Sequence, residues 1–328
     1  MLFSLHSAGV SPSIILFLAL VLDALFGEFG IVFRVLPHPV AMIGGLTGWF
    51  DRRLNRKRLS QGARLARGLL VTLLVVGLAA CAGWGLHRLA NMVLHGWVIE
   101  VLAVTLLVAQ RSLFDHVRAV ARGLEREGLS GGRAAVAQIV GRDPEELDRH
   151  GVARAGIESL AESFCDGVVA PVFWYLILGL PGLAAYKAVN TMDSMIGYRT
   201  ERHAAFGRTA ARLDDVMNFI PARVAAVLIV VASVFVPGGR PGASFRVMAR
   251  DSGKHRSPNA GWPEAAMAGA LDVWLAGPRR YGNRVRQART FNDDGTEADA
   301  SSILRSLRIL ITAQMLFAML VLSLTSNL

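Results

Sequence analysis

Apolar residues are concentrated in long runs along this chain, and charged segments separate the runs. The runs cover residues 13–27, 68–86, 97–109, 168–189, 219–236 and 309–324. Apolar runs of this kind are typical of membrane-spanning helices, and a large soluble all-α protein is the alternative. We therefore predict an all-α polytopic integral membrane protein in which about five of these six runs span the membrane.

The central run, 168–189, contains residues that interrupt helices. Pro171 lies near its start, and Leu180-Pro181-Gly182 lies in its middle. Proline removes a backbone donor and clashes with the preceding turn of a helix. The run therefore either crosses the membrane once with a kink, as a broken helix, or enters and leaves on one face as a re-entrant hairpin.

The charged segments predict the orientation of the chain. Segment 51–68 has seven basic residues and one acid, so the positive-inside rule places it in the cytoplasm and the amino terminus outside. Single crossings then put residues 190–218 outside. A hairpin puts them inside but moves the Arg-rich segment 238–308 outside, against its charge. Both arrangements remain open at this point.

Composition agrees with a membrane location. The chain is 53% hydrophobic with a mean hydropathy of +0.42, and 18% of its residues are charged, against about 25% in soluble domains. Its net charge of +10 flanks the apolar runs, which indicates contact with anionic lipid rather than nucleic acid. We expect one membrane domain, 1–328, in the inner (cytoplasmic) membrane, with cytoplasmic polar helical insertions at about 110–166 and 238–308.

A first group of candidate site residues follows the central run. Lys187, Asn190 and Ser194 share one helical face, and Asp193 lies beside it. A cation together with carboxylate and amide oxygens is what a phosphate–Mg²⁺ site requires. The alternative is a polar seam between membrane helices, since Ser, Thr and Asn often join such helices.

A second group contains two adjacent acids, Asp214 and Asp215. Adjacent helical residues point about 100° apart, so Asp214 with Asn218, four residues on, is the better metal-binding pair. The alternative is a solvated helix end in which Arg208 and Arg212 pair with the acids.

A third group is the acidic stripe Glu158, Glu162 and Asp166. Like charges four residues apart on a helix repel one another unless a cation or a proton lies between them. The stripe is therefore either catalytic or metal-binding, or it is neutralised structurally by Arg154, which begins the same face.

A fourth group occupies segment 254–271. Lys254 and His255 supply positive charge, and Trp262-Pro263-Glu264 is typical of a helix start. A helix amino terminus beside basic residues favours an anion or phosphate site, and a basic loop touching lipid headgroups is the alternative. We predict Lys254, His255, Ser257 and Asn259 as ligand-binding residues of this loop.

Five segments of the chain together resemble the adenosylcobinamide-phosphate synthase family, the membrane enzyme of cobalamin biosynthesis. The segments are LPHPVAMIGGLTGWFDRRLN, GRDPEELDRHGVARAGIESLAESFCDGVVAPVFW, GLPGLAAYKAVNTMDSMIGYR, FGRTAARLDDVMNFIPAR and KHRSPNAGWPEAAMAGAL. They occur in the family's order and cover most of the chain outside the variable spans. Ser163, where the family usually has Asn, and Arg256, where it has Pro, depart from the pattern.

The resemblance implies an ATP-dependent ligase that joins the carboxylate of adenosylcobyric acid to the amine of aminopropanol phosphate or a related amino-alcohol. The matching motifs contain Asp193, Asp214 and Asp215, to which we assign Mg²⁺, with Asn190 assisting. Lys187 is expected to contact ATP. The alternative function is a non-catalytic membrane transporter or sensor of corrinoid or amino-alcohol ligands.

The other motif residues would serve the amine. Lys254 and His255 are expected to bind the phosphate of the amine substrate, and Glu158, Glu162 or Asp166 to act as the base. The expected partners are the corrinoid, the amino-alcohol phosphate and the lipid membrane. A homo-oligomer or contacts with other enzymes of the pathway are further expectations.

Overall fold

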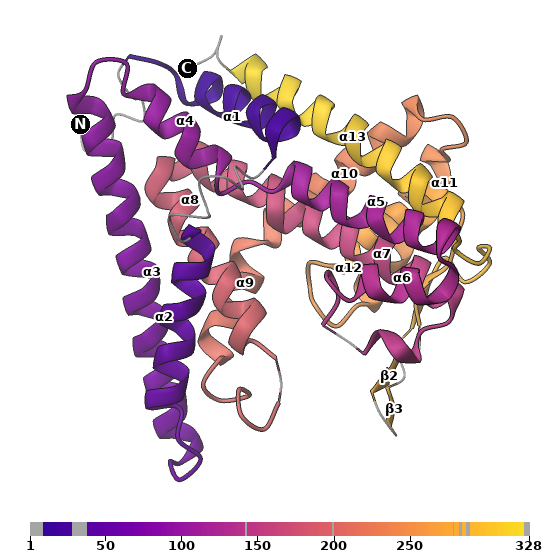
Figure 1. The fold of residues 1–328 in the computed structure, drawn as a ribbon, viewed down its shortest axis with the longest axis horizontal. Helices are drawn as coiled ribbons and strands as arrows, with labels where there is room; N and C mark the ends of the chain where they lie inside the picture. The colour runs from indigo at the N-terminus through magenta and orange to yellow at the C-terminus, as the bar shows by residue number, and fades with distance from the viewer. Residues whose placement is uncertain are drawn as a thin grey trace. The chain divides into compact units, whose positions relative to one another are not determined.

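A computed structural model describes residues 9–27, 38–141, 143–198, 200–277, 279–281, 284–286 and 289–324 (Figure 1). Most of the described residues are helical and very few are in strands, which confirms the predicted all-α fold class. The helices are α1 (Pro12–Phe26), α2 (Pro39–Leu54), α3 (Gln61–Met92), α4 (Trp97–Thr105), α5 (Gln110–Arg126), α6 (Gly128–Val136), α7 (Arg149–Phe164), α8 (Ala170–Ile196), α9 (Arg208–Met217), α10 (Phe219–Phe235), α11 (Pro241–Asp251), α12 (Gly261–Leu271) and α13 (Ala300–Ser323).

Shorter elements join these helices. They are the 3₁₀ turns η2 (Pro144–Glu146) and η4 (Ser252–Lys254), the π-helical turn η3 (Cys165–Val169), and the strands β1 (Leu275–Ala276), β2 (Arg279–Tyr281), β3 (Arg284–Arg286) and β4 (Thr290–Phe291). Strand β1 pairs antiparallel with β4, and β2 pairs antiparallel with β3. The strands were not predicted, because two or three residues are too few to show an alternating pattern.

Four helical stretches of the described residues are long and apolar enough to cross a membrane. They are Gln61–Met92, Trp97–Arg126, Arg149–Ile196 and Ala300–Ser323, and the count is five if α9 and α10 are taken as one broken span. The predicted first span is a helix, α1, but its 15 residues are about 22 Å long. That length is below the roughly 30 Å of a bilayer core.

Helix α3 shows why a membrane is needed. Leu70, Leu73 and Leu78 are each more than half exposed, at 53%, 61% and 57%, whereas Val71 and Val75 are buried. An apolar face of this extent is unfavourable in water, and lipid covers it without cost. One side of α3 therefore packs on protein and another is suited to contact lipid.

The chain divides into two compact units. The first contains Met1–Ala109, Ala170–Asn218 and Val321–Leu328, and the second contains Gln110–Val169 and Phe219–Leu320. Both units include candidate membrane spans. A single membrane domain over residues 1–328 stays a prediction.

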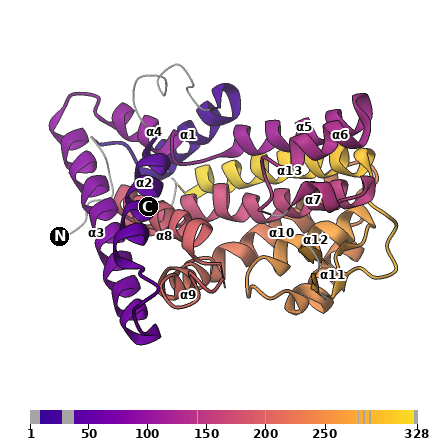
Figure 2. The same ribbon diagram turned by 60° about the horizontal axis from the view of Figure 1, so that its bottom comes forward.

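In the first unit, the second half of α8 runs back along α3. A Cβ on Gly83 would lie 2.8 Å from the Leu180 carbonyl oxygen, and one on Gly68 would lie 1.9 Å from that of Phe206. The two glycines therefore let the α3 backbone contact a neighbouring backbone at two levels along the helix, at Gly68 and at Gly83. Between these levels Met192 and Ile196 join Val71, Val75 and Phe206 in one buried cluster. Helix α2 lies beside α3 in both ribbon views (Figures 1 and 2).

The predicted interruption of the central run is confirmed. Helix α8 breaks at Gly179, where φ is 65° and ψ is −157°. This left-handed backbone conformation is accessible to glycine without strain. Pro181 follows the break, where its missing N–H costs little because the helix begins again. Residues 180–196 therefore form a separate half-helix.

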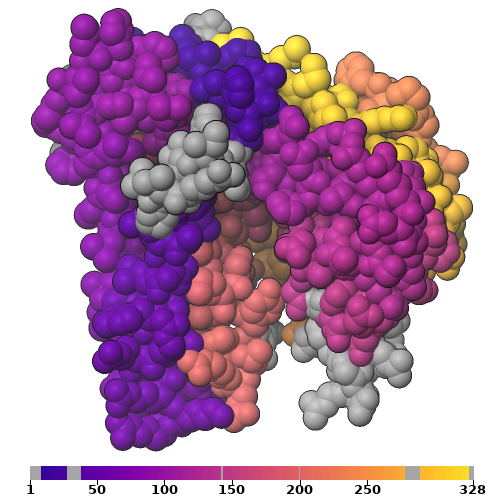
Figure 3. All heavy atoms as spheres, viewed as in Figure 1, coloured from indigo at the N-terminus to yellow at the C-terminus, as the bar shows by residue number. Residues whose placement is uncertain are grey.

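A network of hydrogen bonds holds the residues that follow this half-helix against the end of α2 and the start of α3. Arg202 donates two hydrogen bonds to Asp51 Oδ2, at 3.0 and 2.6 Å, and Asn55 Nδ2 donates to Asp51 Oδ1 at 2.7 Å. Arg64 Nε donates to Asn55 Oδ1 at 2.8 Å, and Asn55 also donates to the Arg202 carbonyl. In Figure 3 the salmon spheres that follow α8 lie against the indigo and purple spheres of α2 and α3.

These contacts settle one part of the orientation left open by the sequence, namely the side on which residues 190–218 lie. Asn55 and Arg64 belong to the basic segment 51–68, so the residues after α8 lie on the same side of the bilayer as that segment. The arrangement that separates residues 190–218 from segment 51–68 by a membrane is therefore excluded. By the positive-inside rule we expect that side to be the cytoplasm.

The second unit has its own core. One face of α5 is apolar and buried, since Val117, Val120 and Leu124 have no exposed surface. The helix predicted at Trp262-Pro263-Glu264 is present as α12, which begins two residues before Pro263, at Gly261, and most of its side chains are buried. Ser244 Oγ donates to the Ala266 carbonyl at 2.8 Å and joins α11 to α12.

Cysteine labelling tests the shared side of these segments. We expect single cysteines introduced as Lys57→Cys and Glu201→Cys, in a chain carrying Cys81→Ser and Cys165→Ser, to react with a membrane-impermeant maleimide from the same side of sealed vesicles. Both wild-type residues are exposed. Labelling of the two positions from opposite sides would contradict the network described above.

Candidate functional site

The acid Asp214 is held by two amides at the meeting of α8 and α9. Asn190 Nδ2 donates to Asp214 Oδ1 at 3.4 Å, and Asn218 Nδ2 donates to Asp214 Oδ2 at 3.0 Å. Tyr186, which is fully buried, donates its hydroxyl to Asn218 Oδ1 at 2.9 Å. The predicted Asp214–Asn218 pair is therefore present, and this chain of hydrogen bonds fixes the orientation of the carboxylate.

Two more carboxylates lie near Asp214. Asp193 is repelled by the charge of Asp215, and Asp214 is repelled by Asp193 and Asp215. Arg212 approaches Asp215 at 3.7 Å but is largely exposed, so this ion pair contributes little. Three partly buried acids that repel one another favour the approach of a cation.

The arrangement fits Mg²⁺ that arrives with a phosphate-bearing ligand. Among the described residues, no group of three or more His, Cys, Asp or Glu side chains is arranged to hold a metal by itself. Mg²⁺ commonly takes one or two carboxylates, several waters and the oxygens of a bound phosphate. Asp193, Asp214 and Asp215 remain our predicted ligands on that basis.

Gly197 allows the backbone to close on Asp193. A Cβ at Gly197 would lie 1.9 Å from Asp193 Oδ1, and the Gly197 N–H donates to the Asp193 carbonyl at 2.7 Å. No larger residue fits without moving the carboxylate. The position of Asp193 therefore depends on a glycine that the sequence analysis did not single out.

The remaining predicted residues of α8 have different environments. Lys187 is 8% exposed and lines a cavity of about 430 Å³ together with His38 and residues 106–109. Ser194 is exposed. The structure thus joins Asn190 to the acids by a hydrogen bond and places Lys187 on a cavity wall, whereas Ser194 faces outward.

The acidic stripe of α7 is divided among three environments. Glu158 is buried, and its Oε1 accepts the Ala276 N–H at 2.8 Å. Glu162 is exposed, and Asp166 lies in the π-helical turn η3, a distortion often found at functional sites. Arg154 stacks on the ring of Trp274, with its guanidinium carbon 3.8 Å from the ring centroid.

Lys254 is held by protein acceptors. Its Nζ lies 3.0 Å from the Thr290 carbonyl, 3.2 Å from Asp293 Oδ2 and 3.0 Å from Asp251 Oδ1. A lysine ammonium has three N–H donors, and these contacts use all of them. Phosphate binding by Lys254 stays a prediction, and the structure also gives this residue a role in holding its loop.

The rest of the loop is organised by short-range hydrogen bonds. His255 Nδ1 accepts the Ser257 N–H at 3.0 Å, and Ser257 Oγ accepts the Asn259 N–H at 3.2 Å. Asn259 Oδ1 accepts from Arg223 Nη1 at 2.9 Å. The guanidinium of Arg223 also stacks on the rings of Phe219 and Trp262. Arg223 was missed because its contacts with Asn259 and Trp262 join segments that are distant in sequence.

Asp251 is the buried acid of this region, with no exposed surface. Burial acts to raise its pKa, but hydrogen bonds from Arg250, the Asn292 N–H and Lys254 outweigh burial and lower the pKa to about 2. The same contact raises the pKa of Arg250. Asp251 is therefore ionised throughout the physiological range and anchors the loop.

A second buried polar cluster was also missed. Glu100 is fully buried, accepts from the Tyr175 hydroxyl at 2.6 Å and lies 3.1 Å from His87 Nδ1. A lone acid within the apolar run 97–109 is the signal that could have found it, since intramembrane acids need partners. Its partners account for its burial.

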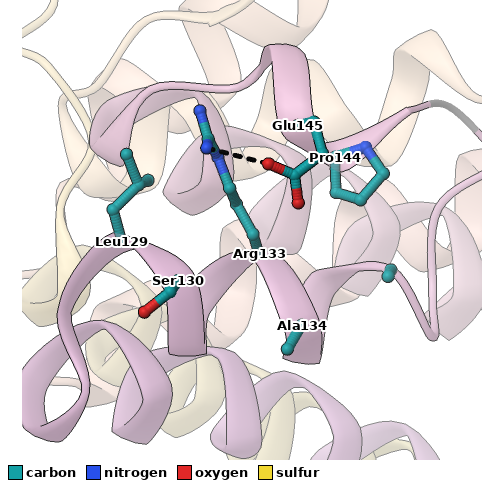
Figure 4. A pocket seen from close by; sticks show the side chains of 7 residues that line it. Leu129, Ser130, Arg133, Ala134, Pro144 and Glu145 are labelled. Atoms are coloured by element: carbon teal, nitrogen blue, oxygen red, sulfur yellow. Dashed lines mark hydrogen bonds and ion pairs between the residues drawn. The ribbon is translucent and has the colours of Figure 1, made fainter.

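A shallow pocket of about 300 Å³ lies between α6 and η2 (Figure 4). Arg133 lines it and pairs with Glu145 at 3.1 Å, and Arg133 Nε also donates to the Leu147 carbonyl at 2.9 Å. The cation of this pocket is thus engaged by protein acceptors, and none of the predicted site residues lines the pocket.

Comparison with known proteins gives a consistent result. The family model described as CobD/Cbib protein matches residues 16–310. A relative from Sinorhizobium sp, named Cobalamin biosynthesis protein CobD, is 52% identical over 82% of this chain and 84% of its own length. Relatives of the same name are 46% identical in Brucella anthropi (94% and 96% covered) and 44% identical in Rhodobacter capsulatus (89% and 90%). No solved structure matches.

Replacement of Asp251 tests the loop anchor. Since its pKa is lower when folded than the usual 3.8, the carboxylate stabilises the fold above pH 4 and loses this effect as pH falls toward 2. We expect Asp251→Asn to lower the free energy of unfolding by about 2 kcal/mol at pH 7. Denaturant titration in detergent at pH 7 and pH 3 should show this difference shrinking at the lower pH, and an unchanged difference would contradict the assignment.

Proposed function

Because the chain belongs to the CobD/Cbib family, we propose that it acts in cobalamin biosynthesis as an ATP-dependent amide ligase. Its substrates would be adenosylcobyric acid and aminopropanol phosphate, or a related amino-alcohol phosphate, and its product adenosylcobinamide phosphate. The observation that carries the proposal is Asp214, whose two oxygens are oriented by Asn190 and Asn218 beside two further acids.

The reaction requires activation of a carboxylate. A carboxylate oxygen of the corrinoid attacks the γ-phosphorus of ATP, which forms an acyl phosphate and releases ADP. The amine then attacks the acyl carbon, a C–N bond forms, and the C–O bond to phosphate breaks. One proton leaves the nitrogen for a base, and inorganic phosphate carries away the bridging oxygen.

The residues of α8 and α9 are suited to hold the nucleotide phosphates. Lys187 would neutralise part of their charge, and Asp193 and Asp214 would meet them through Mg²⁺. The ion would supply charge neutralisation of the transferred phosphoryl group. The amides of Asn190 and Asn218 keep Asp214 in one orientation, so little rearrangement is needed when the ligand binds.

The second unit supplies the residues we assign to the amine. His255, with the turn organised by Ser257 and Asn259, would contact the phosphate of the amino-alcohol, and Lys254 would hold this loop while contributing its charge. The proton acceptor would be Glu162 or Asp166. We place Glu158 third, because one of its oxygens already accepts a backbone hydrogen bond.

The proposed location is the inner membrane, with the nucleotide residues open to the cytoplasm, where ATP is present. The contact between Arg202 and Asp51 supports this side for residues 190–218. We also propose a homo-oligomer or an association with other enzymes of the pathway, and we assign no surface of the protein to this contact.

Substitution of the acids tests the proposal. We expect Asp193→Ala and Asp214→Ala each to reduce ATP-dependent amide formation by about 100-fold or more, as loss of an electrostatic contact to the transferred group does. The assay measures corrinoid amide and ADP in detergent or nanodiscs. Glu201→Gln, an exposed acid in the same unit, is the control and should retain activity. Wild-type activity in both alanine variants would remove the assignment, and corrinoid uptake without ATP turnover would favour a transporter.

Gly197 offers a test that leaves every acid in place. We expect Gly197→Ala to lower amide formation at least about tenfold, because the new methyl group must displace the Asp193 carboxylate. The matched control is Gly45→Ala, since a Cβ at Gly45 meets no atom within 4 Å. If the two variants are equally active at equal thermal stability, the position of Asp193 does not matter for the reaction.

A further inference from the structure

The cavity beside Lys187 has a distinct chemical character. Its volume of about 430 Å³ is within the range of small-molecule sites, roughly 300–1,000 Å³. Val40, Ala41, Leu107 and Val108 supply apolar walls, and Lys187 supplies a cation. A ligand that fills it must therefore combine an apolar part with an anionic part.

His38 adds one directed polar group to the cavity wall. Its Nδ1 accepts the Val40 N–H at 3.1 Å as the cap of α2. In the neutral ring the proton therefore lies on Nε2, which is a hydrogen-bond donor. A cavity with apolar walls and an imidazole in its lining suits a flat heterocycle better than a small polar amine.

Helix α8 carries both Lys187 of the cavity wall and the site residues Asn190 and Asp193. From Lys187 the helix rises about 4.5 Å to Asn190 and about 9 Å to Asp193, at 1.5 Å per residue. Asn190 is hydrogen-bonded to Asp214 at 3.4 Å. Lys187 and Asn190 share a face of α8, and Asn190 joins this face to Asp214 of α9, with Asp193 one turn further along the helix. An extended triphosphate covers a distance of this order.

We propose that this cavity holds the adenosine part of the nucleotide, with Lys187 at the start of the phosphate chain and the Asp193–Asp214 pair at its end. This inference rests on the proposed function, since it presumes that ATP is a substrate. The corrin ring system is too large for the chamber, and the amino-alcohol phosphate lacks the apolar surface to fill it. The other reactants therefore bind elsewhere.

A bulky residue in the cavity tests the assignment. Ala41 is exposed at the cavity wall, so Ala41→Trp can fill the chamber without disturbing a buried core. We expect this variant to bind Mg–ATP at least about tenfold more weakly, which corresponds to about 1.4 kcal/mol. Its affinity for Mg–tripolyphosphate, which has no adenosine, should be unchanged. Met42→Trp, the next and 59% exposed position, is the matched control and should bind both ligands normally.

Calorimetry on the full chain in nanodiscs separates the outcomes. Equal Mg–ATP affinity in Ala41→Trp and Met42→Trp would overturn the inference and leave the proposed function intact. The same holds if Ala41→Trp weakens the binding of Mg–ATP and of Mg–tripolyphosphate equally. If the wild-type chain binds no ATP, the proposed function fails together with it.

Photolabelling of the wild-type chain provides a test that does not depend on how a variant folds. With 2-azido-ATP we expect the label in the peptides that contain residues 38–41 or 106–109. A label confined to other peptides would overturn the inference.

Discussion

The contact between α3 and the second half of α8 determines where the polar residues of the first unit lie. Gly83 lets α3 approach the α8 backbone at Leu180, Gly68 lets it approach Phe206 in the segment after α8, and Met192 and Ile196 fill the space between these levels. Because α8 breaks at Gly179, its second half can return along α3 to the side from which α3 began. Asp193 therefore lies near the end of a half-helix, where a soluble ligand can reach it.

The acids near that end are stabilised in different ways. Asp51 has Arg202 and Asn55 as partners, and these contacts lower its pKa against the effect of burial, which would raise it. Asp214 accepts hydrogen bonds from the amides of Asn190 and Asn218 and has other carboxylates nearby. A paired acid stabilises the fold, whereas a group of repelling acids is costly unless a cation is bound. This contrast distinguishes a structural network from a candidate site within one unit.

Local features of the fold could be predicted from the sequence. The buried face of α5, the break near Pro181, the start of α12 and the Asp214–Asn218 pair all follow from residue types at fixed short spacings. Each depends on helical periodicity or on the backbone preferences of Pro and Gly.

Contacts between distant residues could not be predicted in this way. Arg202 and Asp51 are 151 positions apart, and Ala276 and Glu158 are 118 apart. Periodicity within one helix carries no information about which other helix packs against it. For the same reason the sequence identified Lys254 as a charge but not its acceptors Thr290 and Asp293. The cavity that joins His38 to Lys187 likewise exists only after folding.

The central claim is that the chain uses ATP to activate a corrinoid carboxylate. The most direct test follows an oxygen atom, with the free carboxylate of adenosylcobyric acid labelled with ¹⁸O and the released inorganic phosphate analysed by mass spectrometry. Activation through an acyl phosphate predicts that one ¹⁸O is transferred to phosphate for each amide formed. Amide formation with unlabelled phosphate, or without consumption of ATP, would contradict the account.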